Sequence, residues 1–221
     1  MGRAVIDQLD DAARRVVEAA RYLHDRGLTH GSTGNVSVRV GELVVVTPTG
    51  LSLRTLTAAD LAVVDLNGTR RSGRTPSKEA VLHAAVYRAR PRANAVIHTH
   101  SVWSTAVSCL RDIDEDDALP SLTAYYRMRV GVLPIVPFYP PGAPDLAAHA
   151  GRVAARAHCM LLRNHGPIVA GNDLDHALDV LEELEHTARL RLLLDGRPIV
   201  PVPAEAARRL SDPHIDPPQE A

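Results

Sequence analysis

The sequence predicts one α/β domain, and three observations indicate this fold class. Segments with the hydrophobic period of amphipathic helices alternate with short apolar runs of strand length. No internal repeat and no linker-like break occurs before residue 197. Hydrophobic residues make up 45% and charged residues 23% of the 221-residue chain, which excludes a disordered or low-complexity protein. We therefore expect a single domain over residues 1–196.

Hydrophobic spacing and turn residues define the elements of the N-terminal part. Apolar residues from Val5 to Leu23 follow helical spacing, and Gly27 ends that helix. A glycine-rich turn over 31–35 precedes a hairpin that turns at Gly41-Glu42, and Asn67-Gly68 is a further turn pair. The predicted strands of this part are 36–40, 43–46 and 61–66.

The remaining elements alternate in the same way. Pro76-Ser77 opens a helix that Pro91 closes, with Ser77 as its N-cap. The acidic segment 111–117 and the proline-rich segment 137–144 are expected to be connections. The other predicted elements are strands at 94–98, 132–136, 159–162 and 167–170, and helices at 102–110, 145–157 and 174–194.

Residues 197–221 are expected to form a tail. Six prolines lie between Pro198 and Pro218, and a proline-rich segment favours an extended chain laid on the surface or a disordered one. The predicted organisation is therefore one domain followed by a proline-rich C-terminal tail.

Charge and cysteine content exclude several classes of protein. Lys and Arg number 25 against 26 Asp and Glu, so no strong field attracts nucleic acid or an anionic membrane. No stretch is long and apolar enough to span a bilayer, and the N-terminus lacks a signal-peptide core. Cys109 and Cys159 make no disulfide framework, which favours reduced thiols. We expect a cytoplasmic protein that binds neither nucleic acid nor membrane.

His98 and His100 end an apolar strand and form the first candidate site. Residues two apart on a strand point to the same face, so both imidazoles can reach one metal ion. His165, before Gly166 at another strand end, is a third candidate ligand. Three histidines around zinc with an open fourth position are typical of a catalytic site. The spacing alone leaves a second interpretation open, in which two polar residues merely leave the core.

Glu79 lies in the first turn of the helix that Pro76 opens. A carboxylate there interacts favourably with the helix dipole, which is the structural interpretation. The functional interpretation is a general acid/base beside the metal, since proton transfer at carbon needs a carboxyl group held next to an electrophile. His83, four residues on, is interpreted as a packing or supporting residue rather than a ligand.

Three short turns are candidate phosphate sites. Glycine-rich turns expose backbone N–H groups, and a helix N-terminus with a hydroxyl and a lysine favours an anion. Each pair is weak evidence alone, because the same residues are common in ordinary turns. The three pairs are Gly34-Asn35, Thr49-Gly50 and Ser77-Lys78.

The order and local sequence of these segments resemble the class II aldolase/adducin-head family over about residues 5–195. The matching motifs are Gly34-Asn35-Val36-Ser37, Thr47-Pro48-Thr49-Gly50, Pro76-Ser77-Lys78-Glu79, Val96-Ile97-His98-Thr99-His100-Ser101 and Leu162-Arg163-Asn164-His165-Gly166. The resemblance implies a three-layer α/β/α sandwich around a mainly antiparallel sheet. It also implies a homotetramer with active sites at subunit interfaces.

The resemblance assigns roles to individual residues. It implies that His98, His100 and His165 bind one Zn²⁺ per subunit, or another divalent metal, and that Glu79 is the acid/base. The epimerase branch of the family carries Asp at the position of Glu79, so Glu79 indicates the aldolase-like side. The implied phosphate residues are Asn35, Thr49, Gly50 and Ser77. Lys78 is a departure, because the sugar-phosphate aldolases usually have a second Ser there.

A closer resemblance, to the 3-oxo-tetronate 4-phosphate decarboxylase branch, narrows the substrate. It runs through residues 72–73, 76–79, 100–110, 125–131 and 182–185. That branch converts a β-keto acid phosphate to dihydroxyacetone phosphate and carbon dioxide, which implies a metal-dependent lyase with a small phosphorylated sugar-acid substrate. The alternatives are an aldolase cleaving a ketose 1-phosphate such as L-fuculose 1-phosphate, and a non-catalytic adducin-like module. Intact metal and acid/base residues argue against the module.

The branch resemblance adds Tyr125, Tyr126 and Arg129 to the candidate substrate residues. The planar fork of an arginine is well suited to a substrate carboxylate. Related enzymes take a tyrosine from a neighbouring subunit. A surface arginine in an ion pair is an equally good interpretation of Arg129, so the sequence leaves its role open.

Overall fold

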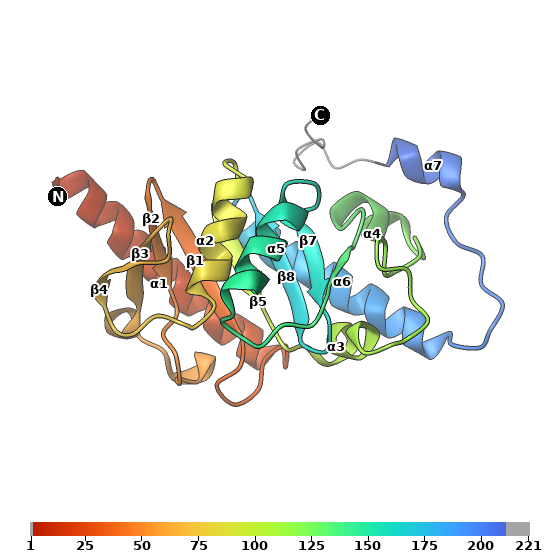
Figure 1. Cartoon of the computed structure of the whole chain (residues 1–221), viewed down its shortest axis with the longest axis horizontal. Coiled ribbons are helices and arrows are strands. Elements are labelled where there is room, and N and C mark those ends of the chain that lie inside the picture. The colour runs from red at the N-terminus through yellow and green to blue at the C-terminus, as the bar shows by residue number, and fades with distance from the viewer. Residues whose placement is uncertain (1, 211–221) are drawn as a thin grey trace.

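The computed structural model describes residues 2–210, in which eight strands form one mixed sheet (Figure 1). The strand order is β4-β3-β2-β1-β5-β8-β7-β6, and every neighbouring pair is antiparallel except β6–β7. The predicted mainly antiparallel α/β class is confirmed. The strands are β1 (Asn35–Val40), β2 (Leu43–Val46), β3 (Ala62–Asp65), β4 (Arg70–Gly73), β5 (Ala95–His98), β6 (Ile135–Val136), β7 (Cys159–Leu162) and β8 (Gly166–Gly171).

Helices cover both faces of this sheet and complete the three layers. Helices α2 and α5 pack against each other over one face, and α1 and α6 lie on the other (Figure 1). None of the described helices is both long and apolar enough to cross a membrane. The helices are α1 (Arg3–Asp25), α2 (Ala80–Ala89), α3 (Val102–Ser108), α4 (Ala124–Arg129), α5 (Pro144–Ala154), α6 (Leu174–Leu193) and α7 (Ala204–Arg209), with short 3₁₀ turns at Leu53–Thr55 and Ala58–Asp60.

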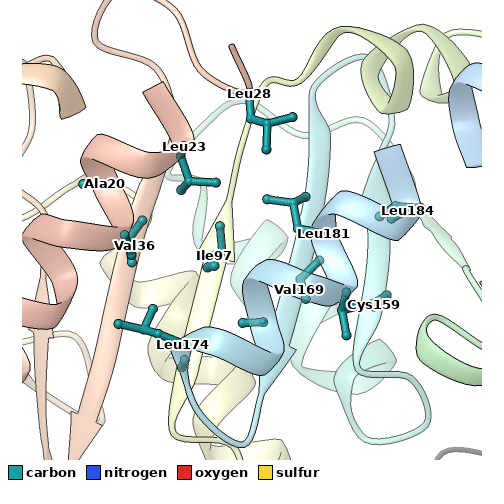
Figure 2. Packing of buried hydrophobic residues seen from close by; sticks show 14 of the residues in the cluster. Ala20, Leu23, Leu28, Val36, Ile97, Cys159, Val169, Leu174, Leu181 and Leu184 are labelled. Carbon is teal, nitrogen blue, oxygen red and sulfur yellow. The ribbon is translucent and has the colours of Figure 1, made fainter. Parts of the chain in front are cut away.

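The sheet separates two hydrophobic cores, because successive side chains of a strand point to opposite faces. On β5, Ile97 packs into the core beneath α1 and α6, whereas Val96 packs into the core beneath α2 and α5. Figure 2 shows the first core, where Leu23 of α1 and Leu181 of α6 lie around Ile97. Burying an aliphatic side chain of this kind contributes about 1.5–3 kcal/mol. The sheet is therefore a rigid support, and its strand ends carry the site.

Three elements differ from those that the sequence predicts. Strand β4 was not predicted, because its four residues are all exposed and show no apolar alternation. Helix α4 was missed because it has only six residues; the side chain of Thr123 caps it by accepting from the Tyr126 N–H at 3.0 Å. The strand expected over 132–136 shortens to Ile135–Val136.

The C-terminal segment is only partly extended. Residues 198–203 have no regular structure and touch the domain where the Val202 N–H donates to the Ser121 carbonyl at 2.8 Å. Ala204–Arg209 then forms α7, which corrects the expectation of a fully extended or disordered tail. Alanine, glutamate and arginine are strong helix formers, and here they prevail over the flanking prolines. The part of the expected tail over 211–221 lies outside the described residues.

Candidate metal centre

The antiparallel pairing of β5 and β8 brings His98, His100 and His165 together. His98 is the last residue of β5, and its partner in β8 is Ile168, three residues beyond His165. One ring nitrogen from each histidine lies within 4.8 Å of the others. The ring centroids are 4.6–4.9 Å apart. Histidines from two distant segments thus converge at one edge of the sheet.

A strained turn allows His165 to approach the end of β5. Asn164 has a positive φ of 55° and Gly166 a φ of 158°. A Cβ atom at Gly166 would lie 2.1 Å from the Thr99 carbonyl oxygen, so a larger residue does not fit. The Thr105 hydroxyl of α3 donates to the His165 carbonyl at 3.1 Å. The turn is thereby held against the strand that carries the other two histidines.

The imidazoles are arranged to offer lone pairs to a common point. Nδ1 of buried His98 lies 2.9 Å from the Pro167 carbonyl, so it donates there and leaves Nε2 free as an acceptor. Nε2 of His98 and Nε2 of His100 are 3.1 Å apart. Burial, reinforced by the neighbouring His98, lowers the pKa of His100 to about 3 and that of His165 to about 4. Both rings are therefore neutral near pH 7, as metal binding requires.

Glu79 is the N-cap residue of α2 and adds a carboxylate to this cluster. Its Oε2 lies 3.4 Å from His98 Nε2, and its Oε1 lies 3.5 Å from His165 Nε2. The Asn35 side-chain N–H donates to Oε2 at 2.8 Å. Burial alone would raise the pKa of Glu79, but His98 and the Asn35 hydrogen bond outweigh it and lower the pKa to about 2. Glu79 is thus ionised at the edge of the histidine cluster.

These donors fit a divalent metal ion. Zn–N bonds of about 2.0–2.1 Å in a tetrahedron separate two ligand nitrogens by about 3.3 Å, close to the spacing of the His98 and His100 nitrogens. Glu79 Oε1 is buried and, within the described part of the chain, has no hydrogen-bond partner. Neutral imidazoles suit zinc and similar transition metals, whereas Ca²⁺ and Mg²⁺ prefer oxygen ligands. The cluster therefore suits a divalent transition metal.

A buried hydrogen-bond network between α2 and β1 fixes the helix end that carries Glu79. His83 Nδ1 lies 2.7 Å from the Ser37 hydroxyl, which is 2.8 Å from the Tyr87 hydroxyl. The Tyr87 hydroxyl donates to the Ser37 carbonyl at 3.0 Å. His83 is fully buried, and its backbone N–H donates to the Glu79 backbone carbonyl at 3.0 Å. The network ties α2 to β1 and fixes the helix end from which Glu79 projects.

The three predicted phosphate turns lie around Glu79. The Thr49 N–H donates to the Thr75 carbonyl and the Ser77 N–H to the Thr47 carbonyl, both at 3.1 Å, so two of the turns adjoin. The Ser77 hydroxyl accepts from the Glu79 N–H at 3.3 Å. Helix α2 begins only at Ala80 with Glu79 as its N-cap, which corrects the expectations that Ser77 is the N-cap and that Glu79 lies in the first turn. Thr49, Gly50 and Lys78 are exposed.

The third predicted phosphate turn adjoins the histidine cluster. Gly34 has a φ of 80°, and a Cβ there would lie 3.0 Å from the His98 carbonyl. Asn35 is buried and pairs with His98 in the register of β1 and β5. Its side-chain N–H donates to the Glu79 carboxylate. Sequence reasoning did not foresee this contact of Asn35, because it joins residues 44 positions apart.

Tyr125, Tyr126 and Arg129 lie on α4. Tyr126 is fully buried in the core, whereas the Tyr125 side chain is 61% exposed. Arg129 pairs with Asp179 at 3.2 Å and lies 5.8 Å from the Tyr125 ring centroid. Among residues 2–210, no hydrogen bond, ion pair or ring contact joins these three side chains to the histidines. A role in the site of the same subunit has no support in these contacts.

Glu185 has a structural role that sequence reasoning missed. Its buried carboxylate accepts from the Trp103 N–H at 2.8 Å and from the Ser104 N–H at 3.0 Å. It also accepts from the Ser104 hydroxyl at 2.6 Å. Glu185 thus caps the start of α3, which begins two residues after His100. No local signal reveals this, because the partners are some 81 residues apart in the sequence.

Known proteins are similar to this chain in sequence. The family described as Class II Aldolase and Adducin N-terminal domain matches residues 14–192. The 3-oxo-tetronate 4-phosphate decarboxylase of Haemophilus influenzae is 44% identical over 185 residues, covering 83% of this chain and 88% of that protein. The L-fuculose phosphate aldolase of Escherichia coli is 34% identical over 181 residues, covering 81% and 82%.

A solved structure agrees with these sequence relationships. The crystal structure of YgbL from Klebsiella pneumoniae is similar with a TM-score of 0.89 and 39% identity, covering 91% of this chain and 98% of that one. Because the family match spans most of the chain and the fold agrees, the sequence resemblance is confirmed. The chain belongs to the class II aldolase and adducin N-terminal domain family.

Proposed function

We propose that this chain is a metal-dependent carbon–carbon lyase that decarboxylates 3-oxo-tetronate 4-phosphate to dihydroxyacetone phosphate and carbon dioxide. The observation that carries the proposal is the convergence of three histidines with a buried, ionised Glu79. The decarboxylases that are 40–44% identical over most of the chain support the choice of substrate. We assign this activity to the domain over residues 1–196.

The proposed metal is Zn²⁺, one per subunit, held by His98, His100 and His165. Three histidine ligands with an open position are typical of catalytic zinc. When bound, the ion supplies Lewis-acid stabilisation of the negative charge that develops on the ketone oxygen of the substrate. The protein contributes the fixed orientation of the three rings, set for His98 by its hydrogen bond to Pro167.

Glu79 is assigned the transfer of the proton to carbon. As the bond to the carboxylate breaks, its electron pair passes to the ketone oxygen, carbon dioxide leaves and an enediolate remains. The former α-carbon then takes one proton to give dihydroxyacetone phosphate, so each turnover consumes one proton. Glu79 is ionised in the free site, and it must therefore accept a proton from solvent before it delivers one to carbon.

The phosphate is assigned to the turns around Glu79. Backbone N–H groups and hydroxyls orient the dianion, and the exposed ammonium of Lys78 adds a positive charge. Gly50 has a φ of 77° and open space where a Cβ would lie, so a ligand has room to approach its backbone. The proposed phosphate-binding residues are Gly34, Asn35, Thr49, Gly50, Ser77 and Lys78.

The Ser77→Ala variant tests the phosphate assignment. We expect the KM for the phosphorylated substrate to rise about tenfold, the scale of a lost hydrogen bond to a charged group, while the KM for the non-phosphorylated analogue stays unchanged. Steady-state kinetics on both substrates measures the difference. Ser52→Ala is the control, because Ser52 caps another helical turn by accepting from the Arg54 N–H. An equal change on both substrates would leave Ser77 only its hydrogen bond to the Glu79 N–H.

The assembly and location are also proposals. We infer a homotetramer in which exposed Tyr125 and the adjacent Arg129 act at the site of a neighbouring subunit. Buried Tyr126 would then support α4 from within the core. We place the protein in the cytoplasm, since Cys109 and Cys159 are free thiols.

The alternative function is an aldolase that cleaves a ketose 1-phosphate, which the 34% identical aldolase of E. coli favours. Both reactions lead to an enediolate, so one site serves either. Purified protein should therefore be incubated with 3-oxo-tetronate 4-phosphates and ketose 1-phosphates, with separate assays for carbon dioxide and aldehyde. We expect carbon dioxide from a keto acid phosphate. Aldehyde release without carbon dioxide from either enantiomer would establish the aldolase instead.

A further inference from the structure

We propose that His30 binds the carboxylate of the substrate and thereby selects a keto acid phosphate over a ketose phosphate. The inference rests on the proposed function and adds a specificity-determining residue to it. His30 belongs to none of the sequence motifs described above, and it lies outside the ligand set.

His30 lies next to the metal centre on the side of His100. The two rings make an edge-to-face contact, with centroids 6.4 Å apart and an interplanar angle of 70°. The three ligand rings are closer to one another, at 4.6–4.9 Å. His30 is also exposed, whereas His98 is fully buried. Its imidazole is therefore placed to contact a molecule bound at the centre rather than the metal itself.

The turn that carries His30 is rigidly held. The His30 N–H donates to the Thr33 hydroxyl at 3.2 Å, and the Thr33 N–H donates to the His30 carbonyl at 3.0 Å. Gly34, at the end of the turn, packs so closely on β5 that a Cβ would lie 3.0 Å from the His98 carbonyl. The backbone of His30 is thus fixed relative to the metal ligands, as a binding residue requires.

Charge determines which end of the substrate meets His30. The carboxylate of Glu79 lies beside His98 and His165, at 3.4 and 3.5 Å. It repels a second carboxylate, so the acid group of a bound substrate is favoured on the side of His100, where a His30 ring N–H can donate to it. Carbon dioxide then leaves away from Glu79, and the proton reaches the carbon from the side of Glu79. A ketose phosphate lacks the group that this contact would recognise.

The test compares two stable ligands in calorimetric titrations of the zinc-loaded protein. The first is 4-phosphotetronate, the alcohol analogue of the substrate, which keeps the carboxylate. The second is dihydroxyacetone phosphate, which lacks it. We expect His30→Leu to weaken binding of the first about tenfold or more and to leave the second unchanged, because a hydrogen bond to a charged group is lost. His30→Gln, which retains a side-chain N–H, should recover part of the affinity.

The controls separate this inference from the proposed function. Zinc content should be equal in all variants, and His186→Ala, at an exposed histidine of α6, should bind both ligands like the parent protein. Equal weakening of both ligands in His30→Leu, or no weakening of either, overturns the role of His30. Failure of the parent protein to release carbon dioxide overturns the function instead, whatever the two ligands show.

Discussion

Replacing Glu79 with Gln is expected to lower turnover by about 10²–10⁴-fold, the usual contribution of a positioned acid/base. Glutamine keeps the size of the side chain and an oxygen that accepts from Asn35, so the local structure should persist. It cannot carry the proton to the enediolate carbon. Metal content and the affinity for dihydroxyacetone phosphate should therefore remain near those of the parent protein, while the kcat for carbon dioxide release falls.

Glu182 provides the matched control for this variant. Its carboxylate accepts from the Tyr22 hydroxyl at 2.9 Å and pairs with Arg26 at 2.6 Å, on the outer side of α1 and α6. Glu182→Gln should release carbon dioxide at the parental rate. If Glu79→Gln also released carbon dioxide at the parental rate, Glu79 would only be a helix-terminal carboxylate that interacts favourably with the α2 dipole.

His100→Ala is expected to remove both the metal and the activity. His100 follows β5 and is only partly buried, so its truncation leaves the sheet and both cores intact. Mutation of a residue that only supports a metal ligand typically costs about 10- to 100-fold in activity. Loss of one of the three ligands themselves should reduce turnover by more than this. Elemental analysis of the purified variant gives its metal content, and circular dichroism checks the fold.

His24→Ala is the companion measurement, because His24 lies in the last turn of α1 and is not part of the histidine cluster. This variant should retain metal and rate. Full metal content together with full activity in His100→Ala would contradict the ligand assignment. A variant that loses metal but keeps its rate would instead contradict a metal-dependent reaction.

Much of the fold could be predicted because its signals are local. Helix α1 shows its apolar stripe within each turn, and the hairpin of β1 and β2 carries its glycine turn between two apolar runs. Strand β4 and helix α4 gave no such signal, since one is exposed throughout and the other is shorter than two turns. The helix α7 shows that residue propensity can prevail within a proline-rich segment.

The residues of the candidate site differ in how far the sequence alone could predict them. That His98 and His100 can reach one ion follows from the two-residue period of an extended segment, which is a local property of the sequence. His165 and Glu79 were candidates from their places at a strand end and near a helix start, but only the family resemblance joined them to His98 and His100, since no local pattern places them beside that strand. The contact of His30 with His100 was not foreseen at all.

By itself, the sequence determined the class of fold, the positions of most elements, and which side chains are the candidates for metal binding and proton transfer. These properties depend on neighbours within a few residues, or on motifs that a family shares. Only the tertiary structure decided that Asn35 holds Glu79 and that Glu185 caps α3. Such contacts depend on strand register and helix packing between residues 44 and 81 positions apart, and a local sequence pattern does not encode that geometry.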